Sequence, residues 1–215
     1  KHREELRIGM ADLMGDIPLP AISRGLSRLA DACLNAALAL AATETAKRCS
    51  AGGGCGGLAV IGAGKLGGRE LIYGSDLDIL FVYDEAGAET PPPGLSVFEY
   101  FSKIAEKIIS YLTTMTREGF AYRVDTRLRP TGAKGPLVQS VVAFRNYFSS
   151  GAETWERQSL VNSRFVAGDR NVGRAFSETL QGLIYRDHDP VALAADIRSM
   201  RKRMQEERGK EDASQ

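Results

Sequence analysis

The chain has 215 residues, of which 43% are hydrophobic and 26% charged, and 28 Lys and Arg against 27 Asp and Glu give a formal net charge of +1. This composition is typical of a globular protein and excludes disorder over the whole length. The near-zero net charge argues against a broad nucleic-acid surface, and no apolar run approaches the roughly 18 residues that a membrane span requires. We therefore expect a cytoplasmic protein that binds neither nucleic acid nor a membrane. Three cysteines and two histidines without metal-ligand spacing also argue against a zinc site or a disulfide framework.

The first half of the chain predicts helices followed by a small α/β unit. Apolar residues recur at helical spacing between about residues 5 and 47, interrupted by Pro18 and Pro20, which predicts two helices. A glycine-rich link at 51–57 comes next. Apolar runs at 58–61 and 77–83 predict buried strands, with room for only a short helix within 65–73. A helix is then expected over 95–118 and a third strand over 121–125.

The second half predicts mainly helices. A loop rich in Pro, Gly and Arg covers 127–136, and helical patterns follow at 141–148, 154–164, 172–184 and 191–207, with frayed residues from 209 onward. We expect a first domain at 1–137, comprising the N-terminal helices and an α/β core at about 57–137. A C-terminal helical region is expected at 138–215.

The glycine motif after the first strand admits two interpretations. Gly62, Gly64 and Gly67 match the GxGxxG pattern, and Asp84 ends the next strand about 20 residues on, where a dinucleotide-binding fold has its ribose-binding acid. A dinucleotide-binding module is therefore one hypothesis. Such a fold would have no use, however, for the acidic pair that lies between the motif and Asp84.

That pair favours a metal-dependent site. Asp76 and Asp78 follow the small-residue turn Gly74-Ser75 and stand two residues apart at the start of a strand, so both carboxylates should emerge on one face. Carboxylates this close need a cation, and Mg²⁺ suits them because it binds carboxylates together with substrate phosphates. Asp125, at the end of the third predicted strand, supplies a third carboxylate. Three such groups on adjacent strand ends suit two-metal phosphoryl transfer.

Basic residues accompany the carboxylates. Arg127 and Arg129 lie in the loop that leaves the third strand, where their guanidinium groups are suited to bidentate phosphate binding. Lys65 lies in the glycine motif and offers a further cation. The alternative roles are structural: the arginines would pair with the carboxylates and hold the loop, and Lys65 would only cap the glycine turn.

These motifs, in this order over roughly residues 7 to 207, resemble the bifunctional glutamine synthetase adenylyltransferase/adenylyl-removing enzymes, within the polymerase-β-like nucleotidyltransferase superfamily. The stretches that carry the resemblance are GKLGGREL from Gly64, GSDLDILF from Gly74, DTRLRP from Asp125 and WERQ from Trp155. Members of the family carry two nucleotidyltransferase domains, one adding AMP to a tyrosine of glutamine synthetase and one removing it by phosphorolysis. One set of motifs occurs here, so the chain resembles a fragment.

The resemblance implies a fold, a reaction and a site. The implied fold is α+β, a polymerase-β-like core with a small mixed sheet, flanked by N-terminal helices and a C-terminal helical bundle. The implied activity is Mg²⁺-dependent transfer of AMP from ATP to glutamine synthetase, which regulates nitrogen assimilation, with the PII signal protein as regulator of the full-length enzyme. The implied catalytic and metal-binding residues are Asp76, Asp78 and Asp125. The implied nucleotide- and phosphate-binding residues are Gly64, Lys65, Gly74, Ser75, Arg127 and Arg129.

Three alternatives stay open at this point. Motif context favours adenylylation, but removal of AMP by phosphorolysis would use the same carboxylates and arginines. The dinucleotide-binding module is the second alternative. The third is a catalytically silent domain that only docks a partner or regulator. Trp155, Glu156 and Arg157 are expected to fasten the C-terminal helices to the catalytic unit and not to take part in chemistry.

Overall fold

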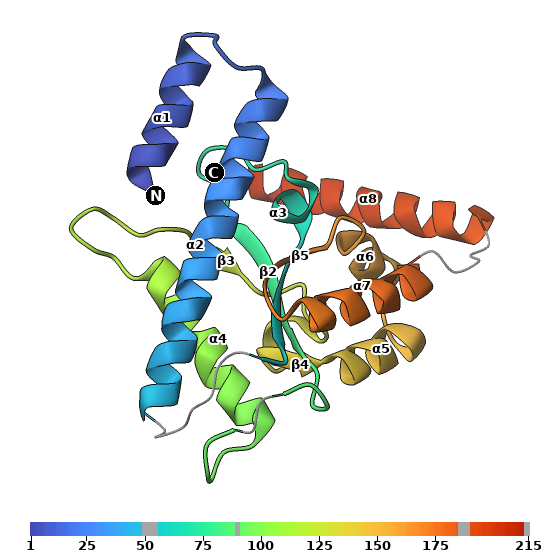
Figure 1. Ribbon diagram of the computed structural model, residues 1–215. Helices are drawn as coiled ribbons and strands as arrows, with labels where there is room; N and C mark the ends of the chain where they lie inside the picture. Colours follow the sequence, from blue (N-terminus) through green and yellow to red (C-terminus); the bar gives the residue numbers. More distant parts are fainter. Residues whose placement is uncertain (49–55, 89–90, 185–189, 213–215) are drawn as a thin grey trace.

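A computed structural model describes residues 1–48, 56–88, 91–184 and 190–212 (Figure 1). The chain begins with two helices, α1 (His2–Leu13) and α2 (Leu19–Arg48), as the apolar spacing predicted. They form a hairpin, and α2 runs across most of the length of the molecule (Figure 1). Most of the predicted glycine link lies outside the described residues.

In the described ranges, the centre of the fold is a mixed sheet of five short strands. They are β1 (Leu58–Gly62), β2 (Leu77–Tyr83), β3 (Val124–Asp125), β4 (Val138–Ser140) and β5 (Arg164–Gly168). β1 lies between β2 and β5 and is antiparallel to both, whereas β3 and β4 are parallel to β2 and share its other edge. β2 thus holds the sheet together, because three of the other four strands pair with it.

Helices cover both faces of the sheet. The helices α2 and α4 (Val97–Thr113) pack on the face formed by alternate residues of β1 and β2 that include Leu58, Val60 and Phe81. The helices α5 (Val141–Ser150) and α7 (Arg170–Ile184) pack on the opposite face. Both strands are therefore apolar on both sides, which explains why their sequences do not alternate with polar residues. The α+β class with a small mixed sheet is confirmed.

The remaining elements lie around this core. They are α3 (Gly64–Gly68), the 3₁₀ turn Gly132–Lys134, α6 (Thr154–Ser159) and α8 (Pro190–Asp212). The α8 helix includes residues 209–212, where fraying was expected. None of the helices in the described ranges is long and apolar enough to cross a membrane.

The predicted helix 154–164 is wrong in its second half, because α6 ends at Ser159 and Arg164–Gly168 forms β5. Its partner is β1, more than 100 residues earlier, so no local pattern marks it. At Gly168 the φ angle is +95°, and a Cβ atom there would lie 2.2 Å from the Leu58 carbonyl oxygen. The short strand β4 was not predicted either. Both strands belong to the segment expected to be a helical region, and they complete the sheet.

The third strand was predicted over 121–125, but β3 contains only Val124 and Asp125. The backbone N–H groups of Ala121 and Tyr122 instead donate to the carbonyl of Leu112, near the end of α4. This helix was expected to continue to residue 118, but it ends at Thr113. The chain between them is thus tied to the helix end, and only the last two residues reach the sheet.

Asp169, between β5 and α7, offers a test of this arrangement. Its carboxylate accepts hydrogen bonds from the backbone N–H groups of Gly57 (2.9 Å) and Asn171 (2.8 Å). Partial burial raises the pKa of this carboxyl, but the backbone hydrogen bonds outweigh burial and leave the pKa below its ordinary value. We expect Asp169→Ala to lower the free energy of unfolding at pH 7 by about 1 kcal/mol, as for the loss of a helix cap.

Because the pKa is lower in the folded state, this contribution is present above about pH 4 and is lost as the pH falls through the folded value. Urea unfolding at several pH values measures it. The exposed Asp16, changed to Ala, serves as the control and should cost less than about 0.5 kcal/mol. Equal losses for the two variants at pH 7 would contradict the assignment.

Candidate active site

The sheet register brings two of the predicted acidic residues together. Asp78 in β2 stands directly opposite Asp125 in β3, and the two strands run parallel. Directly opposed residues of neighbouring strands lie about 5 Å apart and point to the same face. Val124, next to Asp125, packs toward the core formed with α2 and α4, as the alternation predicted. The two carboxylates therefore emerge side by side at the start of β2.

Gly64 fixes the position of Asp78 from the other side. This glycine begins α3 with a φ angle of +51°, and a Cβ atom there would lie 2.5 Å from Oδ2 of Asp78. The backbone N–H of Ala63 donates to the carbonyl of Asp78 (2.9 Å). Glycine is needed here both for the backbone conformation and for the close approach of the carboxylate. The glycine motif and the acidic pair thus belong to one site.

Electrostatics at Asp78 favour a bound cation. Partial burial raises the pKa of its carboxyl, and the negative charges of Asp125 and Asp76 raise it further. The positive charges of Arg127 and Lys65 act in the opposite direction but do not cancel the rise. A cation among these carboxylates would therefore stabilise the ionised form.

Asp125 has a different partner. Arg127 makes a bidentate ion pair with it, in which Nη2 lies 2.6 Å and Nε 2.9 Å from Oδ2. The backbone N–H of Arg127 also donates to Oδ1 (2.8 Å). The side-chain hydrogen bond from Arg127 lowers the pKa of Asp125 despite partial burial. Because the Arg127 side chain is 77% exposed, water weakens the ion pair, and a phosphate or a metal ion can displace it.

Arg129 stabilises its own loop through hydrogen bonds to the backbone and to Thr126. Its Nη1 donates to the carbonyl and hydroxyl of Thr126 (2.7 and 2.6 Å), Nε to the carbonyl of Gly135 (3.1 Å) and Nη2 to that of Ala133 (3.1 Å). All three nitrogens are thus used within the 126–135 loop. Arg129 holds the loop that presents Arg127, and any phosphate contact would use its remaining N–H groups.

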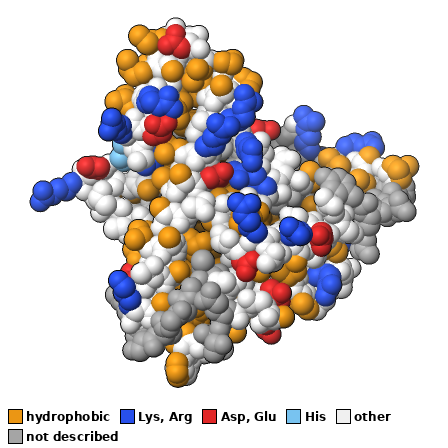
Figure 2. All heavy atoms as spheres, in the orientation of Figure 1, with side chains coloured by type: hydrophobic (Ala, Val, Ile, Leu, Met, Phe, Trp, Pro, Cys, Tyr) orange, Lys and Arg blue, Asp and Glu red, His pale blue; other side chains and the backbone are white. Residues whose placement is uncertain are grey.

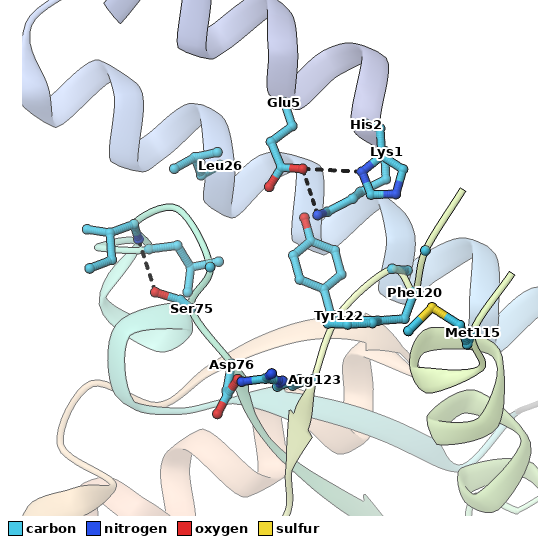
Figure 3. A pocket seen from close by; sticks show the side chains of 15 residues that line it. Lys1, His2, Glu5, Leu26, Ser75, Asp76, Met115, Phe120, Tyr122 and Arg123 are labelled. Atoms are coloured by element: carbon cyan, nitrogen blue, oxygen red, sulfur yellow. Dashed lines mark hydrogen bonds and ion pairs between the residues drawn. The ribbon is translucent and has the colours of Figure 1, made fainter. Parts of the chain in front are cut away.

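The third predicted acidic residue, Asp76, does not lie in the strand pairing that brings Asp78 and Asp125 together. Asp76 precedes β2, is exposed, and lines a cavity of about 380 Å³ together with Gly74 and Ser75. Ser75 closes the turn, since its Oγ accepts a hydrogen bond from the backbone N–H of Ile72 (3.2 Å). Arg123 lies beside Asp76 in this cavity (Figure 3). The predicted residues of this turn therefore border the site, with Asp76 at its outer edge.

The donor set suits Mg²⁺ only in part. Hard carboxylate oxygens of Asp78 and Asp125 fit this ion, which takes one or two carboxylates and fills its other positions with water and phosphate oxygens. Within the described residues, no three His, Cys, Asp or Glu side chains are grouped as a ready-made metal site. Asp76 would have to turn inward and Arg127 release Asp125 for all three carboxylates to share an ion.

Sequence reasoning missed Arg164, which supports the glycine motif from β5. Its guanidinium donates to the carbonyl of Leu66 in α3 through Nη2 (3.1 Å) and Nε (3.3 Å). Nη2 also makes an ion pair with Asp31 of α2 (2.7 Å). The partners are about 100 and 133 positions away in the sequence, so no local motif reveals them. Arg164 thus fixes α3, and with it Gly64, against α2.

The dinucleotide hypothesis is wrong. A dinucleotide-binding unit needs two parallel strands joined by a crossover helix, whereas β1 and β2 are antiparallel. Asp84 follows β2 at its far end, six residues after Asp78, which corresponds to about 20 Å along the strand. It therefore does not share a site with the glycines of the motif.

Positive charge gathers around the carboxylates. Figure 2 shows Lys and Arg side chains concentrated over the middle of this face, across α2, α3 and β3. The exposed basic residues in this part of the surface include Arg24, Arg28, Lys65, Arg69, Arg123 and Arg127. Such a concentration in a chain of near-zero net charge attracts a polyanion to this site.

Two residues of the WERQ stretch make structural contacts, but these lie within the C-terminal region and do not fasten it to the catalytic unit as expected. Glu156 accepts a hydrogen bond from the hydroxyl of Tyr147 (2.8 Å), and Nη2 of Arg157 donates to the carbonyl of Phe148 (3.1 Å). Both contacts tie α6 to α5. Trp155 is 47% exposed and borders α8.

The contact between Gly64 and Asp78 makes a sharp prediction. Gly64→Ala should cost the positive-φ strain, about 1–2 kcal/mol, plus a further 1–3 kcal/mol for the clash with the carboxylate. Gly94→Ala is the matched control, because Gly94 also has a positive φ angle (+85°) but nothing within 4 Å of its added Cβ. In an Asp78→Ala background the Gly64 cost should fall to that of the control. Urea unfolding of the four variants measures this, and an unchanged cost in that background would refute the contact.

The raised pKa of Asp78 predicts a gain in stability when its charge is removed. A carboxyl whose pKa is higher in the folded state loses stability as the pH rises from about 4 through the folded value. Asp78→Asn should therefore unfold at higher urea than the wild type at pH 7.5, with the gap closing toward pH 4. Millimolar Mg²⁺ should stabilise the wild type and leave Asp78→Asn unchanged.

The control for this experiment is Asp16→Asn, since Asp16 is exposed and far from the carboxylates in the sequence. It should change neither the pH dependence nor the response to Mg²⁺. The electrostatic account would be contradicted if Asp78→Asn were less stable than the wild type at pH 7.5. It would also be contradicted if Mg²⁺ stabilised Asp78→Asn as much as the wild type.

Comparison with known proteins shows the family of this chain. A family model described as glutamate-ammonia ligase adenylyltransferase matches residues 1–179. Proteins named bifunctional glutamine synthetase adenylyltransferase/adenylyl-removing enzyme are similar, including that of Nitrosococcus oceani (40% identical, over 94% of this chain and 22% of the relative). The protein of Chromobacterium violaceum is 40% identical over 95% of this chain and 22% of its own length. That of Methylococcus capsulatus is 38% identical over 96% of this chain and 23% of its own length. The chain thus spans less than a quarter of these relatives, and it belongs to the glutamate-ammonia ligase adenylyltransferase family.

Proposed function

We propose that this chain is a nucleotidyltransferase unit that transfers AMP from ATP to a tyrosine of glutamine synthetase and so regulates nitrogen assimilation. The observation that carries the proposal is the register that sets Asp78 beside Asp125, with Gly64 against Asp78. A strand-borne carboxylate pair next to a glycine turn is what a polymerase-β-like core uses to hold a nucleoside triphosphate. The helices after the sheet would form the flanking C-terminal bundle.

The proposed reaction forms a bond between the tyrosine oxygen and the α-phosphorus and breaks the bond from that phosphorus to pyrophosphate. The phenol proton leaves as the new bond forms, and Asp125 is a metal ligand or the general base that receives it. Its lowered pKa, caused mainly by Arg127, favours the role of ligand. Pyrophosphate departs with the negative charge that develops in the transition state.

The basic residues stabilise that charge. Arg127 is exposed and, in the part of the chain that the structure describes, its side chain binds only Asp125, so it can turn to the triphosphate. Lys65 stands at the glycine turn on the other side of Asp78. Arg129 keeps the Arg127 loop in place, and Gly74 and Ser75 shape the turn before Asp76. Mg²⁺, held by Asp76, Asp78 and Asp125, would polarise the phosphate and neutralise its charge.

The names of the relatives include adenylyl removal as well as addition. In the removal reaction, inorganic phosphate attacks the phosphorus of the AMP-tyrosine bond, which gives ADP and free tyrosine. The same carboxylates would serve both directions, and the arginines would bind the attacking phosphate. Motif context favours addition, so adenylylation is the reaction we propose. Action in the cytoplasm and control by the PII signal protein follow from the family resemblance.

The test offers the chain both reactions. One arm contains unmodified glutamine synthetase with Mg²⁺ and ATP, and the other contains the adenylylated enzyme with Mg²⁺ and phosphate. We expect AMP incorporation in the first arm only, and a loss of at least about 100-fold in Asp76→Asn and Asp78→Asn, because each removes a charge that acts in the transition state. Asp84→Asn, at the far end of β2, is the control and should keep full activity.

Each other outcome has a distinct meaning. Release of ADP in the second arm alone would reverse the direction and leave the carboxylate roles intact. Full activity of Asp78→Asn would refute those roles. If glutamine synthetase binds tightly but the chain neither binds Mg²⁺-ATP in calorimetry nor moves AMP in either arm, the chain is a docking domain.

A further inference from the structure

We infer that the cavity beside Asp76 receives the acceptor side chain, an aromatic residue bearing a hydroxyl on an extended protein segment. The inference rests on the proposed function and locates its second substrate. The cavity measures about 380 Å³ and lies between α1, the turn before β2 and the segment that leads into β3 (Figure 3). This volume lies near the lower end of the range of about 300–1,000 Å³ that is typical of small-molecule pockets.

The lining of the cavity suits an aromatic side chain. Leu26, Leu71, Phe120 and Tyr122 contribute apolar surface from three separate parts of the chain. Charged groups stand on two sides of the cavity: Lys1, His2 and Glu5 on the α1 side, and Asp76 and Arg123 on the sheet side (Figure 3). An apolar wall binds an aromatic ring, and a ring whose hydroxyl points to the sheet side brings that oxygen to Asp76.

The cavity also stands where an acceptor is needed. In phosphoryl transfer the attacking oxygen and the leaving group lie roughly in line, on opposite sides of the phosphorus. The glycine turn after β1 contacts Asp78 from one side of β2, whereas the cavity is bordered by 121–123, which lead into β3 on the other side. The carboxylates therefore lie between the phosphate-binding turn and the cavity, and Asp76 borders the cavity itself.

Two large apolar side chains at the cavity are exposed, which indicates a protein acceptor. Ile72 is 52% exposed and Met115 is 67% exposed, although both contribute to the lining. They project from different loops, one before β2 and one after α4. Apolar side chains on the rim of a pocket are typical of a surface that a partner protein covers. A free small molecule inside the cavity would leave them in water.

The test removes these rim contacts and leaves the catalytic residues unchanged. In Ile72→Ser, Met115→Ser and the double variant, the KM for glutamine synthetase should rise, by about tenfold in the double variant. The kcat at saturating acceptor and the Kd for Mg²⁺-ATP, measured by calorimetry, should stay within twofold of the wild type. Leu13→Ser is the matched control, because Leu13 is 87% exposed but lies at the end of α1, away from the cavity lining.

A second measurement does not depend on turnover. A photo-crosslinking phenylalanine analogue at position 115 should become attached to glutamine synthetase on illumination, and the same analogue at position 13 should not. An acceptor KM that matches the control, or equal cross-linking from both positions, would overturn the inference while leaving AMP transfer intact. A rise in the Kd for Mg²⁺-ATP with an unchanged acceptor KM would also overturn it, since the cavity would then belong to the nucleotide. If the wild type moves no AMP in either direction, the proposed function fails and the inference fails with it.

Discussion

The close approach of Asp78 to Asp125 is the constraint on which the rest of the site depends. Two carboxylates on opposed positions of parallel strands repel each other, and partial burial of Asp78 weakens the screening that water would provide. The fold offsets this with Arg127 on Asp125 and with the nearby charge of Lys65. Arg127 and Lys65 are both exposed, so their positive charges offset the repulsion between the carboxylates only in part, and another cation can replace them. Under the proposed function, a divalent cation and a polyanion that arrive together would complete this compensation.

The apolar layers make this unfavourable arrangement possible. β1 and β2 are buried on both faces, by α2 and α4 on one and by α5 and α7 on the other, so the strand ends cannot move apart without exposing the core. Arg164 adds a polar link from α2 to α3 through Asp31 and the Leu66 carbonyl. Gly64 then keeps the glycine turn in contact with Asp78. The packing of the core thus holds the carboxylates of Asp78 and Asp125 close together in spite of their repulsion.

Local pattern was enough for some parts of the fold and not for others. The strands at Leu58 and Leu77 were predicted because continuous apolar runs mark strands buried on both faces, and the carboxylates were predicted because residues two apart share a strand face. β5 was missed because its partner β1 is over 100 residues away, and the helical spacing before Arg164 hid it. The support of α3 by Arg164 has the same origin. Interactions between distant segments, and not local propensity, account for the parts that the sequence did not reveal.

The central claim is that Asp78 and Asp125 bind one metal ion together with the nucleotide phosphates, after Arg127 has left Asp125. The most direct measurement is a crystal structure of the protein with Mn²⁺ and a non-hydrolysable ATP analogue, using the anomalous signal of the metal. The account predicts an anomalous peak within coordination distance, about 2.1–2.2 Å, of oxygens from both carboxylates, with the Arg127 guanidinium on a phosphate. A metal bound elsewhere, or a nucleotide bound while Arg127 still pairs with Asp125, would contradict it.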